Sequence, residues 1–123
     1  MSAQWEASAA SYQSLVENAS DIITVVEPDL TIVLHTGSGA RMLGYSPGEL
    51  AGTKFSALVD AGGLFRLRVA CAGVADGVAT RPVELRLLTS SGEWIDAETA
   101  VRLDSDTNRL VLSTRDATAV SYT

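Results

Sequence analysis

The sequence predicts an α+β domain, because its hydrophobic pattern alternates between helical and strand-like spacing along the chain. Two short strand-like runs follow an N-terminal helical stripe, and three longer strand-like runs follow a second helical stripe. Of the 123 residues, 46% are hydrophobic and 20% are charged, a balance typical of a folded chain with one core. We therefore expect a single domain with helices and strands in separate stretches.

The first 19 residues predict an amphipathic helix that flanks the domain. Its apolar side chains recur at the spacing of one helical face, at Trp5, Ala9, Tyr12, Val16 and Ala19. A stripe this wide must pack either on the domain itself or on a partner, and we expect two copies of the chain to pair through it. Trp5, Tyr12 and Val16 would form the centre of that homodimer.

The next segment predicts a β-hairpin. Residues 22–27 are rich in β-branched side chains, residues 31–35 are again apolar, and Pro28-Asp29 marks a turn between the two runs. Gly37 and Gly39 then interrupt the second strand.

Short helices are expected after the hairpin. Ser46 and Glu49 have the three-residue spacing of a capping box, and Pro47 occupies the first helical position, where proline is favoured. Gly52 would end this helix, and residues 54–59 can hold one further turn.

A longer helix and three strands complete the pattern. Leu64, Leu67, Cys71 and Val74 lie on one helical stripe. Beyond it, residues 83–87, 93–103 and 109–115 read as three strands that successive turns join. Alternation along these strands predicts which apolar side chains face inward, namely Val83, Leu85, Leu87, Ile95, Val101, Leu110 and Leu112.

Three local motifs in this order resemble the PAS family. The first is Met42-Leu43-Gly44-Tyr45-Ser46-Pro47-Gly48-Glu49-Leu50-Ala51-Gly52, the second is Ser91-Gly92-Glu93-Trp94, and the third is Arg115-Asp116-Ala117-Thr118. The resemblance covers residues 12–118. It implies a five-stranded antiparallel sheet with short helices on one face, formed by residues 20–118, with residues 119–123 as the start of a linker.

The resemblance also implies a function. PAS domains sense signals within larger proteins, so the chain would regulate an effector elsewhere and would have no catalytic activity of its own. Asp116 and Thr118 stand where the chain would leave the sheet towards that effector. A small apolar ligand would lie between the sheet and the helices, among the pocket candidates Val25, Leu43, Leu58, Leu67, Cys71, Leu85 and Leu112.

Two alternatives remain open from the sequence. The first is an interaction domain without a ligand, whose core is filled by its own side chains. The second is a small α+β enzyme of the ketosteroid-isomerase or thioesterase kind, which needs an acid or base facing the cavity. The apolar inward positions of the last three strands argue against the enzyme.

Composition excludes several other classes of function. The net charge of −6 and the scattered basic residues argue against nucleic-acid binding. One cysteine and one histidine do not suffice for a protein zinc site, and no carboxylate cluster predicts calcium. No apolar run reaches the ~18 residues of a membrane span, and no signal peptide is evident, so we expect a cytoplasmic protein. The excess of arginine over lysine suggests a GC-rich bacterial source.

No cofactor is predicted. Haem-binding PAS domains place their ligand histidine on the long helix, and residues 64–74 contain none. The reactive cysteine of flavin photosensors has no counterpart in residues 55–58, and Cys71 reads as a small buried residue. Trp94 is the position at which a flavin could stack, although packing is the simpler interpretation. We expect His35 to be a strand-end residue bonded to water or backbone.

Overall fold

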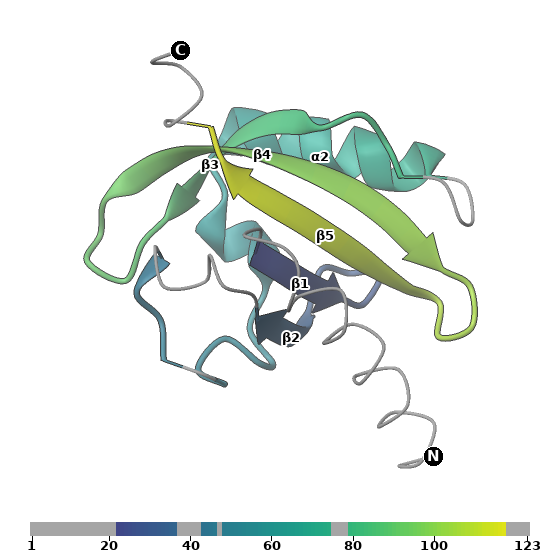
Figure 1. The fold of residues 1–123 in the computed structure, drawn as a ribbon, viewed down its shortest axis with the longest axis horizontal. Coiled ribbons are helices and arrows are strands. Elements are labelled where there is room, and N and C mark those ends of the chain that lie inside the picture. The colour runs from purple at the N-terminus through teal and green to yellow at the C-terminus, as the bar shows by residue number, and fades with distance from the viewer. Residues whose placement is uncertain (1–21, 37–42, 47, 75–78, 118–123) are drawn as a thin grey trace.

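The structure, a computed structural model, describes residues 22–36, 43–46, 48–74 and 79–117. Five antiparallel strands form one sheet in the order β2-β1-β5-β4-β3, which confirms the expected sheet (Figure 1). The strands are β1 Ile22–Val26, β2 Ile32–Thr36, β3 Val83–Leu88, β4 Trp94–Asp104 and β5 Arg109–Asp116. The flanking helix expected over residues 1–19, the linker at 119–123 and the dimer residues Trp5, Tyr12 and Val16 lie outside the described residues.

The first strand is an interior strand of the sheet. β1 pairs with β2 on one side and with β5 on the other, and all five of its residues are buried. This burial on both faces accounts for the run of β-branched residues without polar alternation. Beside it, Thr99 and Thr114 on β4 and β5 are fully buried, and their hydroxyl oxygens lie 2.8 Å apart in a hydrogen bond.

One face of the sheet carries the helices. The 3₁₀ helix η2 (Phe55–Leu58) and the α-helix α2 (Ala61–Gly73) both contribute to the same core, and α2 runs alongside β3 and β4 (Figure 1). The predicted stripe of α2 is confirmed, because Leu67 is fully buried and its stripe neighbours pack against the core. The helix begins three residues before the stripe, where the Asp60 carboxylate caps it.

The short helix predicted after Ser46 is wrong over residues 48–52, which form successive turns. The capping pair itself is present, since the Ser46 N–H donates to Glu49 Oε1 at 2.8 Å. Gly48 and Gly52 both have left-handed backbone angles, at φ 81° and 86°, which a right-handed helix does not allow. The Glu49, Ala51 and Thr53 N–H groups each donate to the carbonyl three residues earlier, as in successive turns, and the Gly52 N–H donates to Ile32 O of β2 at 2.8 Å.

The Gly44-Tyr45 motif fastens the middle of the chain to the end of β3. The Tyr45 hydroxyl donates to Leu88 O at 2.8 Å, and the Ser90 hydroxyl donates to Gly44 O at 3.0 Å. Gly44 has φ 78°, and an added Cβ would collide with the Ser90 side chain. Glycine is therefore required at this position, which gives the motif a structural meaning.

The core lies between the sheet and the helices. Each predicted inward residue of β3, β4 and β5 belongs to the core or packs at its margin, so the predicted strand phase is confirmed. The buried core residues are Ile22, Val26, Leu30, Ile32, Leu43, Leu50, Phe55, Leu58, Val59, Leu67, Leu85, Leu87, Ala97, Val101, Leu110 and Leu112.

Candidate functional site

The structure brings together six of the seven predicted pocket residues. Leu43, Leu58, Leu67, Leu85 and Leu112 are buried in the core, and Cys71 is partly buried against it. These six residues come from the middle segment, η2, α2, β3 and β5 and meet on the helix-covered side of the sheet.

Val25 does not join this group. Its neighbour Thr24 lies opposite Leu112 in β5, so Thr24 shares the inner face with Leu112. Adjacent strand residues point to opposite faces, which places Val25 on the outer face of the sheet. Val25 is fully buried there, and the uniformly β-branched run of β1 carried no signal that could separate its two faces.

A groove of about 430 Å³ opens at one end of the core, beside Cys71. Three parts of the chain form its walls: the C-terminal half of α2, the turn between β1 and β2, and the end of the β4–β5 hairpin. Leu30 and Leu110 are the buried part of the lining, and Arg68, Ala72 and Asn108 form its exposed rim. The lining residues are Pro28, Leu30, Arg68, Cys71, Ala72, Val74, Leu103, Asn108 and Leu110.

Leu30 reaches the groove through an unusual backbone conformation. Its φ of 72° lies in the left-handed region, which costs a residue with a Cβ about 1–2 kcal/mol. The Leu30 N–H donates to Glu27 O at 2.8 Å, so the tight turn fixes this conformation. The leucine side chain is only 3% exposed. Burial of that side chain offsets the backbone cost and explains why a glycine is not found here.

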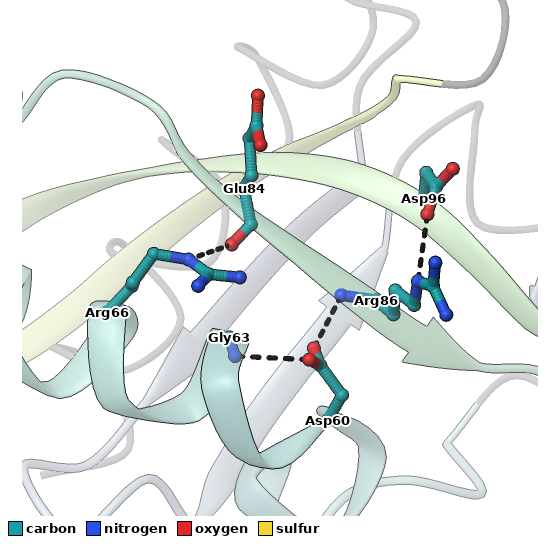
Figure 2. A network of polar contacts seen from close by, with 6 residues as sticks. All are labelled: Asp60, Gly63, Arg66, Glu84, Arg86 and Asp96. Carbon is teal, nitrogen blue, oxygen red and sulfur yellow. Dashed lines mark hydrogen bonds and ion pairs between the residues drawn. The ribbon is translucent and has the colours of Figure 1, made fainter.

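A second, polar recess lies at the opposite end of α2 (Figure 2). One Asp60 oxygen accepts a hydrogen bond from the Gly63 N–H at 3.2 Å, and the other accepts one from the Arg86 N–H at 2.8 Å. The Asp60 N–H in turn donates to Arg86 O at 3.2 Å. Asp60 therefore joins the start of α2 to the edge strand β3. The Arg86 N–H is the main reason that the pKa of the Asp60 carboxyl is below its usual range.

Two arginines extend this network across the strands. Arg66 donates through Nε to Glu84 O at 2.8 Å, and Arg86 forms an ion pair with Asp96 on β4 at 3.1 Å (Figure 2). The Ala117 N–H donates to Asp96 O at 3.0 Å, so the chain leaves the sheet beside the same network. Asp116, a predicted exit residue, ends β5 opposite Ala97, whereas Thr118 lies outside the described residues.

His35 differs from the sequence-based interpretation. Its Nδ1 lies 3.1 Å from Thr24 Oγ1, so its partner is a side chain and not water or backbone. Within the described part of the chain, its Nε2 is buried and has no hydrogen-bond partner. Burial lowers the pKa of the imidazole below its ordinary value of 6.5. The neutral ring is therefore favoured at neutral pH.

A β-bulge turns His35 inward. Val26 pairs with Ile32 but Val25 pairs with Leu34, so the register between β1 and β2 shifts by one residue. Without this shift, His35 would lie opposite Ile23 and face outward. The hairpin sequence gives no local sign of the bulge, which is why sequence reasoning missed the position of His35.

The described residues offer little other reactive chemistry. Among them, no group of three or more His, Cys, Asp or Glu side chains is placed to hold a metal ion, and no helix is both long and apolar enough to cross a bilayer. Burial raises the pKa of the Cys71 thiol, which disfavours the reactive thiolate. Trp94 is about half exposed and follows the outer-face phase of β4, so it points away from the core.

Comparison with known proteins identifies the family. A family model described as PAS fold matches residues 16–121, and no curated protein sequence matches the chain. The PAS domain of an HTR-like protein from Haloarcula marismortui superposes with a TM-score of 0.69 at 19% identity, covering 94% of this chain and 96% of that one. A domain of a sensory box sensor histidine kinase/response regulator from Geobacter sulfurreducens gives 0.67 at 19% identity, covering 89% and 94%.

A third solved structure is the Cycle PAS-B domain of Drosophila melanogaster with bound ethylene glycol. It superposes with a TM-score of 0.62 at 14% identity, covering 77% of this chain and 98% of that one. At these identities the superpositions establish the fold, and the family model, which spans most of the chain, establishes descent. The chain belongs to the PAS-fold family.

Proposed function

We propose that this chain is a sensory and signal-transduction module that regulates an effector elsewhere in a larger protein. In this proposal it binds a small apolar ligand, and it pairs with a second copy through its first 19 residues. The observation that carries the ligand-binding part is the groove beside Cys71, because its buried floor is continuous with the core. No bound cofactor is part of the proposal.

Contacts at both ends of α2 support a route from ligand to effector. The groove is formed in part by the C-terminal half of α2, and the Asp60–Arg86 contact lies at its N-terminal end. A ligand that shifts α2 would therefore move Arg86 relative to Asp96. Their ion pair lies beside the chain exit at Ala117. Asp116, the last residue of β5, would then set the direction of exit.

Native mass spectrometry of the purified chain tests this function. The expected result is a dimer, with an additional mass of a few hundred daltons on part of the population, and a colourless solution. A chain that stays monomeric and carries no added mass, even after incubation with a mixture of apolar metabolites, would contradict the proposal. In the full-length protein, Asp116→Ala should change effector output while the thermal midpoint stays nearly constant.

An interaction domain without a ligand is the second candidate. The observation that favours it is the filled core, in which Leu43, Leu67 and Leu112 are almost completely buried. Native mass spectrometry separates the two candidates, because this one requires a dimer or a bound protein partner without any small molecule.

The enzyme alternative rests on His35, which does lie on the inner face. Its Nδ1 partner is a threonine hydroxyl, whereas a general base is usually oriented by a carboxylate or backbone group. The contact therefore favours a structural or ligand-binding histidine over a catalytic one.

A further inference from the structure

We propose that the groove beside Cys71 binds a small anionic amphiphile, with its carboxylate on Arg68 and its apolar chain over Leu30 and Leu110. This inference rests on the proposed ligand-binding function and adds the chemical class of the ligand. Among the nine described residues that line the groove, Arg68 is the only one with a formal charge. The chain as a whole carries a net charge of −6, so the positive charge of Arg68 is the feature of the lining that would attract an anion.

The guanidinium of Arg68 is available for a ligand. Within the described part of the chain, it forms no hydrogen bond or ion pair. Arg66, two residues earlier, instead donates to Glu84 O and lies in the recess at the other end of α2. A guanidinium binds a carboxylate through two parallel N–H donors, so Arg68 supplies directional recognition as well as charge.

The apolar part of the groove suits a short hydrocarbon chain. Leu30 and Leu110 are 3% and 6% exposed and form the floor, and Val74, Cys71 and Leu103 are partly buried around it. The volume of about 430 Å³ falls within the range of roughly 300–1,000 Å³ that small-molecule sites occupy. A hydrophobic floor with one charged group at the rim matches a molecule that is apolar along its length and anionic at one end.

The geometry of α2 places the binding positions for the ligand's carboxylate and for its hydrocarbon chain on the same side of the helix. Arg68, Cys71 and Ala72 are separated by three and four residues, which puts them on one face of α2. The positive charge of Arg68 acts on the Cys71 thiol, where it partly opposes the rise in the pKa that burial causes. Residues three apart on a helix have Cβ atoms about 5–6 Å apart, so one molecule can contact both Arg68 and Cys71.

Sodium decanoate, used below its micelle concentration on the full chain, is the test ligand. Decanoate should perturb the backbone amide resonances of Cys71 and Leu110, and it should slow alkylation of Cys71, the only cysteine of the chain. Arg68→Gln should weaken decanoate binding by about tenfold, as expected for loss of a charged hydrogen-bonded contact. The matched control is Arg66→Gln on the same helix, which should leave the dissociation constant unchanged.

Decanol separates the charge from the chain. It has the same length and no charge, so it should bind the wild type about tenfold more weakly than decanoate does. Its affinity for Arg68→Gln should equal its affinity for the wild type. A cooperative urea transition for each of the two arginine variants would show that both remain folded. The inference is overturned if decanoate and decanol bind alike, if Arg66→Gln weakens binding as much as Arg68→Gln, or if the perturbed resonances are those of Leu43 and Leu58.

The experiments distinguish a failure of the groove inference from a failure of the proposed function. If decanoate does not bind at millimolar concentration but native mass spectrometry still shows another small molecule, the groove inference is lost and the sensory function stands. If neither decanoate nor any co-purified molecule is found, both the groove inference and the ligand-binding function are lost.

Discussion

Asp60 and Arg86 exchange two hydrogen bonds at the outer edge of the sheet: the Arg86 N–H donates to the Asp60 carboxylate (Figure 2), and the Asp60 N–H donates to Arg86 O. The second carboxylate oxygen caps α2 at the Gly63 N–H. One side chain thus satisfies two N–H groups, one at the start of the helix and one at the edge strand. Edge strands need such protection, because their unpaired groups otherwise invite another chain.

Asp60→Ala should lower the free energy of unfolding by about 1–3 kcal/mol, since it removes a helix cap and leaves the Arg86 N–H without its acceptor. Asp60→Asn keeps one acceptor oxygen and should lose less than Asp60→Ala. Urea denaturation monitored by far-ultraviolet circular dichroism measures both values. Equal stability of the wild type and Asp60→Ala would mean that water replaces the carboxylate at no cost.

The contribution of Asp60 should also depend on pH. Hydrogen bonds lower the pKa of this carboxyl in the folded chain below its ordinary value of 3.8. The unfolded chain therefore takes up the proton first, and the contribution is complete above about pH 5 and lost as the pH falls through the folded pKa. The stability difference between the wild type and Asp60→Asn should shrink between pH 5 and pH 2.5. A difference that is constant over this range would contradict the assignment.

Gly62 and Gly63 provide a matched pair of helix substitutions. A Cβ on Gly63 would collide with the Asp60 carboxylate and lie 2.5 Å from Leu85 Cβ, whereas a Cβ on Gly62 meets nothing closer than 3.6 Å. Gly63→Ala should therefore destabilise by about 1–3 kcal/mol through overpacking. Gly62→Ala should stabilise by up to about 1 kcal/mol through helix propensity. The urea midpoint should fall for Gly63→Ala and rise for Gly62→Ala relative to the wild type. A change in the same direction for both variants would show that α2 does not pack closely on β3.

Local sequence patterns predicted much of this fold. Alternation along β3 placed Leu85 and Leu87 inward correctly, because a strand side chain has only two faces to choose between. The stripe through Leu67 identified the buried face of α2 for the same reason, with helical spacing in place of alternation.

The groove and the polar recess depend on contacts between residues far apart in the chain. Asp60 meets Arg86 at a separation of 26 residues, and no local pattern announces that pairing. Position 35 turned inward because of a bulge, and the groove needs three separate segments to meet. Sequence reasoning named Cys71 and Leu110 individually, but it gave no reason to join them with Leu30 and Arg68.

Because of His35, the free energy of unfolding should decrease as the pH falls below neutral. Burial lowers its pKa in the folded chain below 6.5, so the unfolded chain binds the proton more readily. Stability should be constant above about pH 7.5 and decrease as the pH falls through 6.5 towards the folded pKa. His35→Gln can still hydrogen bond to Thr24 but cannot titrate. Because His35 is the only histidine, the difference between wild type and variant isolates its effect. Parallel curves from pH 7.5 to 5 would show that His35 is accessible to water.

At position 30, the usual order of stability of alanine and glycine variants should be reversed. Both substitutions remove a side chain that is 3% exposed, and loss of a buried leucine typically costs about 2–5 kcal/mol. Leu30→Ala keeps a Cβ at φ 72° and so retains the backbone strain, whereas Leu30→Gly removes that strain.

The expected order of stability is therefore wild type, then Leu30→Gly, then Leu30→Ala, with about 1 kcal/mol between the two variants. At an ordinary position, glycine would be the less stable of the two, because it gives the unfolded chain more freedom. Urea midpoints for the three proteins measure the order. If Leu30→Gly is instead the most stable, the leucine side chain contributes less than the strain it imposes, and the floor of the groove is not held by burial of Leu30.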